Sequence, residues 1–211
     1  ALALEKELGK KINIINQGGA SGSIGSQKAK DAPTDGYTLL FSADSLGSQR
    51  VMGLSDLSYD DFEPIRVLAD DPKVIVVSSD SKYSTIEDLF LDIKENPNKI
   101  KMSYTGPGGS GHVQAIIYEQ LGYKPALIAY DGGMDGILAV LGNQVDFTNA
   151  NYSTVAPYIE SGDLKLLAVS SKNKIKKYPD IPLLKDLIDK DNRYFNLPFT
   201  PLSLLINKDT D

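Results

Sequence analysis

A short apolar segment, a glycine-rich turn and an amphipathic segment follow one another repeatedly along this 211-residue chain. The predicted strands are residues 12–15, 37–41, 73–77, 100–104, 126–130, 145–148 and 164–169. Strands that alternate with helices predict an α/β fold whose sheets are mainly parallel and covered by helices on both faces. Right-handed crossovers then place every turn from strand to helix at one sheet edge, where ligands bind. The glycine-rich turns are therefore expected to converge on a site.

Composition excludes several classes of function. The net charge is −6, and the densest basic group, residues 172–177, is interleaved with polar residues and precedes Tyr178-Pro179. We interpret it as a solvated loop and expect no nucleic-acid partner. The absence of cysteine removes thiol catalysis, disulfides and thiolate metal sites. Apolar runs fall far short of the roughly 20 residues of a membrane span. The chain opens at Ala1 within a predicted helix, so we expect a segment upstream of it.

Two glycine-rich turns carry most of the signal for a ligand. Residues 18–25 and 106–111 each precede a predicted helix, whose first N–H groups and dipole favour an anion. The first turn fits neither a dinucleotide motif nor a P-loop, and a pure packing role is an equal alternative for it. Ser110 is expected to cap the second helix. The nucleophile-elbow pattern fails at His112, which we interpret as structural or ligand-binding rather than as a base.

Acidic residues offer one further candidate. Asp146 interrupts a predicted apolar strand, and a buried carboxylate needs hydrogen bonds or a charged partner. At the carboxyl end of a strand it would face the cleft and take a ligand ammonium, although a structural role is as plausible. Tyr130, at the end of the preceding strand, is a second candidate wall of the site. The pairs Asp60-Asp61 and Asp70-Asp71 are interpreted as surface carboxylates.

Eight segments, taken in order, resemble one family: the extracytoplasmic solute-binding receptors of tripartite tricarboxylate transporters, of the TctC or Bug type. The matching segments are LEKELG (4–9), NQGGASGSIG (16–25), PTDGYTLLF (33–41), YDDFEPI (59–65), YDGG (130–133), GNQVD (142–146), SGDLKLLAV (161–169) and YPDIP (178–182). No single segment is specific, but their common order covers nearly the whole chain.

The resemblance implies a two-lobed receptor that closes over a small organic anion, with the type II-like periplasmic-binding-protein (Venus flytrap) fold. Residues 1–101 and 196–211 would form the first lobe, incomplete at both ends, and residues 102–195 the second. Backbone N–H groups of the glycine loops would hold a carboxylate. The ligand-binding residues carried over from the family are Ala20, Ser21, Ser42 and Ala43 in the first lobe, and Ser110, Tyr130, Gly132, Gly133 and Asp146 in the second.

The chain departs from the family pattern in one turn that could bear on specificity. Met134-Asp135 replaces the small residues that usually follow the glycines at 132–133. If Asp135 faced the cleft, its carboxylate would disfavour a second anionic group of the ligand. This substitution favours a zwitterion or a smaller anion over a simple dicarboxylate.

We therefore expect a monomeric receptor outside the cytoplasm, periplasmic or lipid-anchored, that captures a small carboxylate or an amino acid. Its partners would be the membrane permease subunits of the transporter, and we expect no cofactor, no metal and no catalytic residue. An α/β hydrolase or transferase acting on a small anion is the first alternative, although one histidine and no cysteine weigh against it. A ligand sensor for a signalling partner is the second.

Overall fold

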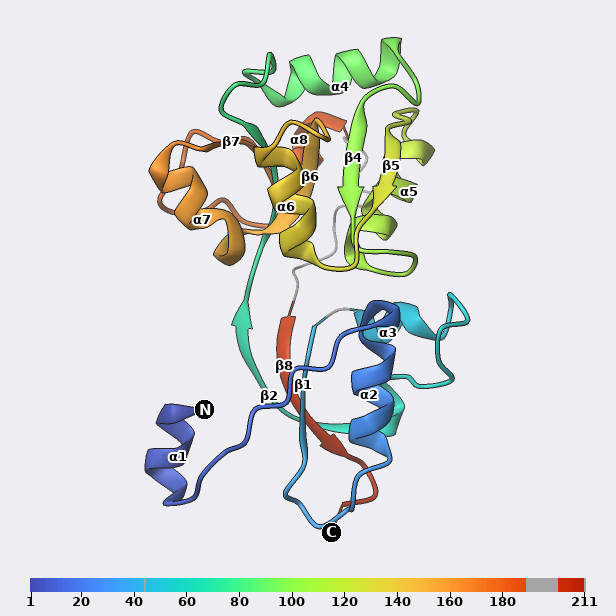
Figure 1. Cartoon of the computed structure of the whole chain (residues 1–211), viewed down its shortest axis with the longest axis vertical. Helices are drawn as coiled ribbons and strands as arrows, with labels where there is room; N and C mark the ends of the chain where they lie inside the picture. The colour runs from blue at the N-terminus through green and yellow to red at the C-terminus, as the bar shows by residue number, and fades with distance from the viewer. Residues whose placement is uncertain (44, 189–200, 211) are drawn as a thin grey trace.

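The computed structural model describes residues 1–43, 45–188 and 201–210, which form two lobes, one above the other in Figure 1. The first lobe contains a sheet ordered β1-β8-β2, and the second a five-stranded sheet ordered β5-β4-β6-β3-β7. The strands are β1 (Leu39–Ser42), β2 (Phe62–Asp70), β3 (Lys73–Ser78), β4 (Lys101–Tyr104), β5 (Ala126–Ala129), β6 (Phe147–Asn151), β7 (Leu164–Ser170) and β8 (Pro201–Asn207). The predicted two-lobed α/β fold is confirmed.

Helices are distributed over both lobes. Those of the first lobe are α1 (Leu2–Leu8), η1 (Ala20–Gly22), α2 (Ser23–Lys30), α3 (Ser45–Gln49) and η2 (Tyr59–Asp61). Those of the second are α4 (Ile86–Glu95), α5 (Ser110–Gln120), α6 (Gly133–Leu141), α7 (Tyr152–Ser161) and α8 (Leu184–Ile188). None of the helices in these described ranges is long and apolar enough to cross a membrane.

Strand direction differs from the prediction of mainly parallel sheets. Both described pairings in the first sheet, β1 with β8 and β2 with β8, are antiparallel. In the second sheet β4 is parallel to β5 and β6, whereas β3 is antiparallel to both β6 and β7. Helical crossovers, which parallel pairing requires, connect β4 to β5 and β5 to β6. Strand β3 arrives from the first lobe instead and inserts in the opposite direction.

The boundary between the lobes lies earlier than predicted. The chain passes from the first sheet to the second between Asp70, where β2 ends, and Lys73, where β3 begins. Residues 73–101, assigned from sequence to the first lobe, therefore belong to the second. The predicted end of the second lobe at Phe195 lies outside the described residues, and β8 returns to the first sheet.

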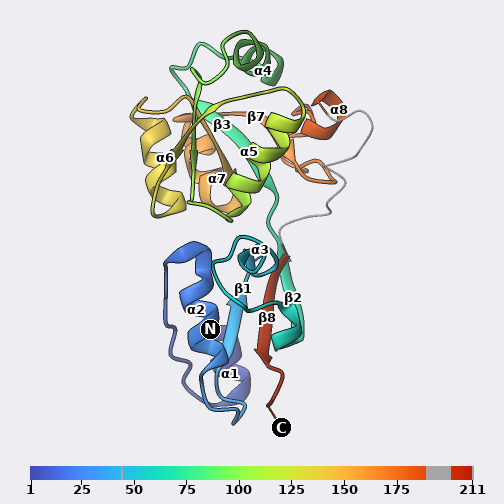
Figure 2. The same cartoon turned by 90° about the vertical axis from the view of Figure 1, so that its right-hand side faces the viewer.

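Two apolar clusters, one on each face of the second sheet, form the main core. Strand β3 supplies both: Ile75 and Val77 pack with α4, α5 and α8, and Val74 and Val76 pack with α6 and α7. Figure 2 shows these helices on the two sides of the sheet. All four side chains are fully buried, which confirms the two-sided burial expected from their unbroken apolar run. At about 1.5–3 kcal/mol for each such side chain, this strand anchors the lobe.

The first lobe has a smaller apolar cluster, formed by Leu46, Leu57, Phe62 and Leu205. Residues 12–15 were predicted as a strand, but they do not pair with any strand in the described part of the chain. Ile14 and Ile15 are exposed. Ile12 N donates to the Glu5 side chain at 2.7 Å rather than to a neighbouring strand, so the segment is not part of a sheet.

A polar cluster closes the end of the second lobe beside α4. The Asp92 carboxylate accepts hydrogen bonds from Lys82 Nζ and Tyr83 Oη at 2.7 Å, and from Asn96 Nδ2 at 2.8 Å. These hydrogen bonds, led by that of Lys82, lower the pKa of Asp92 to about 2. Burial and the Asp92 hydrogen bond raise the pKa of Tyr83.

Asp92→Asn is expected to lower the free energy of unfolding at pH 7 by about 1–2 kcal/mol. Because the folded-state pKa of Asp92 lies below its unfolded value, its contribution is complete above about pH 4 and disappears as the pH falls through about 2. Urea unfolding at pH 7, 4 and 2 measures this. If the difference in free energy of unfolding between the unmodified protein and Asp92→Asn stayed constant from pH 7 to pH 2, the prediction would be contradicted.

Candidate functional site

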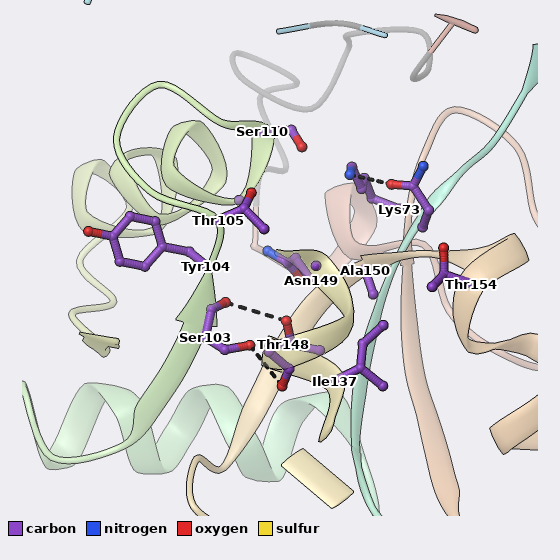
Figure 3. Close-up of a pocket in the computed structure, with 14 residues that line it drawn as sticks. Lys73, Ser103, Tyr104, Thr105, Ser110, Ile137, Thr148, Asn149, Ala150 and Thr154 are labelled. Atoms are coloured by element: carbon purple, nitrogen blue, oxygen red, sulfur yellow. Dashed lines mark hydrogen bonds between the residues drawn. The ribbon is translucent and has the colours of Figure 1, made fainter. Parts of the chain in front are cut away.

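A cavity of about 180 Å³ opens at the carboxyl ends of β4 and β6 (Figure 3). In Figure 1 the arrowheads of β4 and β5 point toward the first lobe, so this edge of the sheet faces it. The cavity is lined by second-lobe residues: Lys73, Ser103, Tyr104, Thr105, Ser110, Gly111, Gly133, Gly136, Ile137, Thr148, Asn149, Ala150, Asn151 and Thr154. The second of the two predicted glycine turns, residues 106–111, leads directly into it.

Two helices begin at the cavity wall, and within the described residues neither has a side-chain cap. Helix α5 begins at Ser110 and α6 at Gly133, with Gly109 and Gly132 as their N-cap residues. The prediction that Ser110 caps α5 is therefore wrong, because Gly109 occupies the cap position. The first N–H groups of a helix have no partner within that helix. Together with the helix dipoles, they make this wall a site for negative charge.

The third helix at this edge, α7, has its N-terminus capped by a side chain of the protein itself. At the start of α7, the carboxylate of Asp71 accepts Ser153 N at 3.0 Å and Ser153 Oγ at 2.6 Å. Asp71 is only 6% exposed, so its interpretation as a surface carboxylate is corrected. It is buried because it caps the helix, which leaves α5 and α6 as the helix ends open to a ligand.

Lys73 brings a positive charge to the cavity. Because β3 runs against β6, the register pairs its first residue, Lys73, with Asn151, the last residue of β6. Lys73 Nζ donates to Asn151 Oδ1, and Asn151 Nδ2 donates to Asp71 Oδ2 at 3.0 Å. The sequence prediction missed Lys73 because a parallel β3 would have placed it at the opposite edge.

Neutral polar groups complete the walls. Ser103 Oγ donates to Gly136 O at 3.3 Å, and Thr148 Oγ1 donates to Ser103 O at 3.4 Å. Asn149 Nδ2 donates to Tyr118 Oη at 2.8 Å, and burial raises the pKa of that tyrosine. No aspartate or glutamate is among the described residues that line the cavity. Among the described residues, the cavity therefore combines the Lys73 ammonium, the N-termini of α5 and α6 and neutral hydrogen-bonding groups.

Asp146 lies at the opposite edge of the sheet. It precedes β6, and its Oδ2 accepts the backbone N–H of Lys101, the first residue of β4, at 2.7 Å. The Asp146 N–H donates in return to Lys101 O at 2.9 Å. The expectation that Asp146 faces the cleft is therefore wrong. Its carboxylate links the start of β6 to the start of β4. This contact corresponds to the structural role that the sequence analysis gave as the alternative.

The other predicted second-lobe residues lie at or beside the cavity. Ser110 and Gly133 line it, and Gly132 immediately precedes Gly133 as the N-cap of α6. Tyr130 donates its N–H to Tyr104 O at 2.9 Å, and its side chain packs with the core cluster on the α6 face. Tyr130 therefore supports the wall from behind.

The predicted first-lobe residues do not line the cavity. Ala20 and Ser21 have φ of 44° and 52°, in the left-handed region, and Ser21 Oγ donates to Pro107 O of the second lobe at 2.7 Å. In the other predicted pair, Ser42 Oγ donates to Ala43 O at 3.2 Å. The residue 18–25 turn thus contacts the loop that leads into α5, beside the site rather than within it.

Loop 106–109 of the second lobe contacts side chains of the first lobe. Gly108 has φ +81°, and a Cβ there would lie 2.9 Å from Leu54 Cδ1 and 3.2 Å from Met52 Cγ of the first lobe. The close approach of these side chains and the left-handed backbone both require glycine.

His112 makes two contacts within the second lobe. Its Nδ1 accepts the Gly108 N–H at 3.2 Å, and its ring stacks on Tyr104 at 5.5 Å between centroids. Across the described residues, no group of three or more histidine, cysteine, aspartate or glutamate side chains could hold a metal ion.

Comparison with known proteins places these observations in one family. Residues 1–208 match the family described as "Tripartite tricarboxylate transporter family receptor". Protein BugT of Bordetella pertussis is 27% identical over 194 residues, which cover 89% of this chain and 59% of BugT. The chain thus spans about three fifths of that relative's length.

Solved structures agree with the fold. The periplasmic binding protein BugD matches with a TM-score of 0.83 and 26% identity, over 100% of this chain and 70% of that one. MatC from Rhodopseudomonas palustris with bound malate has a TM-score of 0.83 at 18% identity, over 99% of this chain and 71% of MatC. The latter likeness is one of fold alone.

Asp146→Ala is expected to lower the free energy of unfolding by about 1–3 kcal/mol, because the Lys101 N–H loses its acceptor. Ligand affinity should stay unchanged, since the residue lies at the far edge from the cavity. Urea unfolding and calorimetric titration of the variant measure the two quantities. Weaker ligand binding with an unchanged free energy of unfolding would show that Asp146 contributes to the binding site.

Gly133→Leu is expected to weaken ligand binding at least tenfold with little change in melting temperature. A Cβ at Gly133 would meet Thr105 Cγ2 at an ordinary 3.9 Å, but a larger side chain would enter the cavity that both residues line. Gly136→Ala is the control: its Cβ would lie 2.8 Å from Ser103 Oγ, so it should cost about 1–3 kcal/mol of stability. Equal losses of binding and stability in Gly133→Leu would indicate a packing role instead.

Proposed function

The chain belongs to the tripartite tricarboxylate transporter receptor family, and we propose that it captures a small organic carboxylate in the second-lobe cavity. Delivery to the membrane permease of such a transporter would follow. The family is one of binding receptors rather than enzymes. In line with this, His112, the one histidine of the sequence, is engaged by a backbone N–H and a stacked tyrosine.

The observation that carries the proposal is the charge pattern of the cavity. The Lys73 ammonium and the N-termini of α5 and α6 favour negative charge, while the acid-free lining among the described residues offers nothing to oppose it. Hydrogen bonds between a carboxylate and ionised or backbone donors are the strong ones in a partly dehydrated site. Among the described lining residues, the pattern suits an anion better than a cation.

Size points to a ligand of a few carbon atoms. The cavity of about 180 Å³ is smaller than the roughly 300–1,000 Å³ typical of sites for drug-sized molecules. The malate bound to MatC is a molecule of the size we propose for this chain.

Amino acids are the less favoured ligand class. The ammonium of a zwitterion needs a carboxylate or several acceptors, and Asp146, the residue expected to supply one, lies at the opposite edge. Asp135 is exposed and is not among the described lining residues, although its Oδ2 would lie 3.1 Å from a Cβ on Gly132. We therefore favour a mono- or dicarboxylate over the zwitterion suggested by Met134-Asp135.

The first lobe would complete the site when the lobes close. Ala20, Ser21, Ser42 and Ala43 belong to that lobe, and Ser21 is already bonded to the loop leading into α5. We propose that these residues cover the ligand from the far side and that Gly132 and Gly133 hold its carboxylate.

Such a receptor works outside the cytoplasm, in a periplasm or on a lipid anchor, and we propose that it acts as a monomer.

A thermal-shift and calorimetric screen tests the proposal. Malate, succinate, adipate, aspartate, arginine and AMP are each titrated into the protein, because a ligand of the folded state raises the melting temperature by mass action. At least one carboxylate is expected to raise it by several degrees and to be recovered unchanged. A shift with arginine or AMP alone, or turnover of the ligand, would overturn the proposal.

A further inference from the structure

We infer that Lys73 is the residue that selects negatively charged ligands in this cavity, and that Asp71 is its positioning residue, acting through Asn151. The inference rests on the proposed function and deepens it. It assigns the charge discrimination of the receptor to a side chain of the segment that joins the two lobes.

Lys73 lies at the ligand edge because of the direction of β3. The register places it opposite Asn151 on one side and Ser170 on the other, each the last residue of its strand. The first residue of β3 therefore joins the carboxyl ends of β6 and β7. Lysine is a point charge on a flexible stem, so its position depends on what holds the ammonium.

The amide of Asn151 connects the ammonium to a buried carboxylate. Its oxygen accepts from Lys73 Nζ, while its nitrogen donates to Asp71 Oδ2 at 3.0 Å, so both ends of the amide are used in a defined orientation. The same carboxylate holds Ser153 through two further hydrogen bonds. A carboxylate fixed by three hydrogen bonds and buried to 6% exposure is a rigid anchor for the amide.

The anchor and the cation both lie at the crossing between the lobes. Strand β2 ends at Asp70 and β3 begins at Lys73, so residues 71–72 are the connection and Lys73 follows it directly. Its backbone is tied to the second lobe by the hydrogen bond from Tyr152 N to Pro72 O at 2.9 Å. A ligand carboxylate that pairs with Lys73 therefore contacts the segment about which the lobes would close.

Substitution of Lys73 separates charge recognition from shape recognition. Lys73→Met should raise the Kd for malate, succinate and adipate by roughly 10- to 100-fold, the scale of one charge-assisted hydrogen bond. It should also lower the ratio by which each acid is preferred over its neutral diamide. Lys124→Met, which removes an exposed lysine of the same lobe, should leave both quantities unchanged.

Substitution of Asp71 tests the positioning role. Asp71→Asn should reduce the preference for acids over diamides, because the Asn151 amide loses its ionised acceptor. Ser153→Ala is the matched control: it removes one Asp71 bond of the helix cap without touching Asn151. The control should lower the melting temperature yet keep the preference for acids. If the role of Asp71 were merely structural, the two variants would not differ in that preference.

The outcomes are separable. If no carboxylate of the three binds the unmodified protein, the proposed function fails and the assignment of Lys73 fails with it. If a carboxylate binds but Lys73→Met keeps the affinity and the preference for the acid, only the inference is overturned. Lys73→Arg guards against a folding defect, since it retains the charge and should retain the preference for acid over diamide.

Discussion

The direction of a single strand, β3, determines where the charged groups of this protein meet. Its apolar side chains supply both core clusters, so its place in the middle of the second sheet is set by burial. Because it runs against its two neighbours, its first residue lies at the carboxyl edge of β6 and β7, the edge at which helices α5, α6 and α7 begin. Lys73, Asn151 and Asp71 are thus brought together by strand direction rather than by proximity in sequence.

The three helices at that edge differ in how their N-termini are satisfied. Helix α7 receives the Asp71 carboxylate, whereas α5 and α6 begin behind glycines and, in the described structure, have no side-chain cap. A helix end left open costs stability, because its N–H groups lack partners. Such a cost is reasonable where a bound anion supplies the missing acceptors. The same physical rule therefore separates α7, whose N-terminus is capped by the protein, from the two helices whose N-termini remain open to the cavity.

Much of the fold could be predicted from sequence, since it depends on local patterns. The alternation of apolar strands with glycine-terminated helices indicated the α/β class, and the unbroken run at residues 74–77 indicated a strand buried on both faces. Strand direction, by contrast, depends on partners distant in the chain, so the parallel prediction failed at β3 and in the described pairings of the first sheet. The boundary at 101 and the placement of Asp71 on the surface failed because they too depend on distant partners. Asp146 was misplaced because β6 begins only at Phe147, which puts Asp146 at the amino end of the strand. Of the candidate site, Ser110 and Gly133 were found through the glycine turns that precede helices. Lys73 gave no such signal, because nothing local distinguishes a lysine at the start of a reversed strand.

The strand order of the first lobe also bears on how the chain acquires its structure. Strand β8 lies between β1 and β2, pairing Leu39 with Ile206 and Phe62 with Asn207. The strands β3 to β7, by contrast, are contiguous in sequence. During synthesis the second lobe can therefore form before the central strand of the first has left the ribosome, and β1 and β2 must wait for it. Pairings that distant in sequence are slow to form, because loop closure must be achieved before any contact compensates for it. The strand order thus favours assembly from the middle of this sequence outward, with the ligand edge in place before the first lobe.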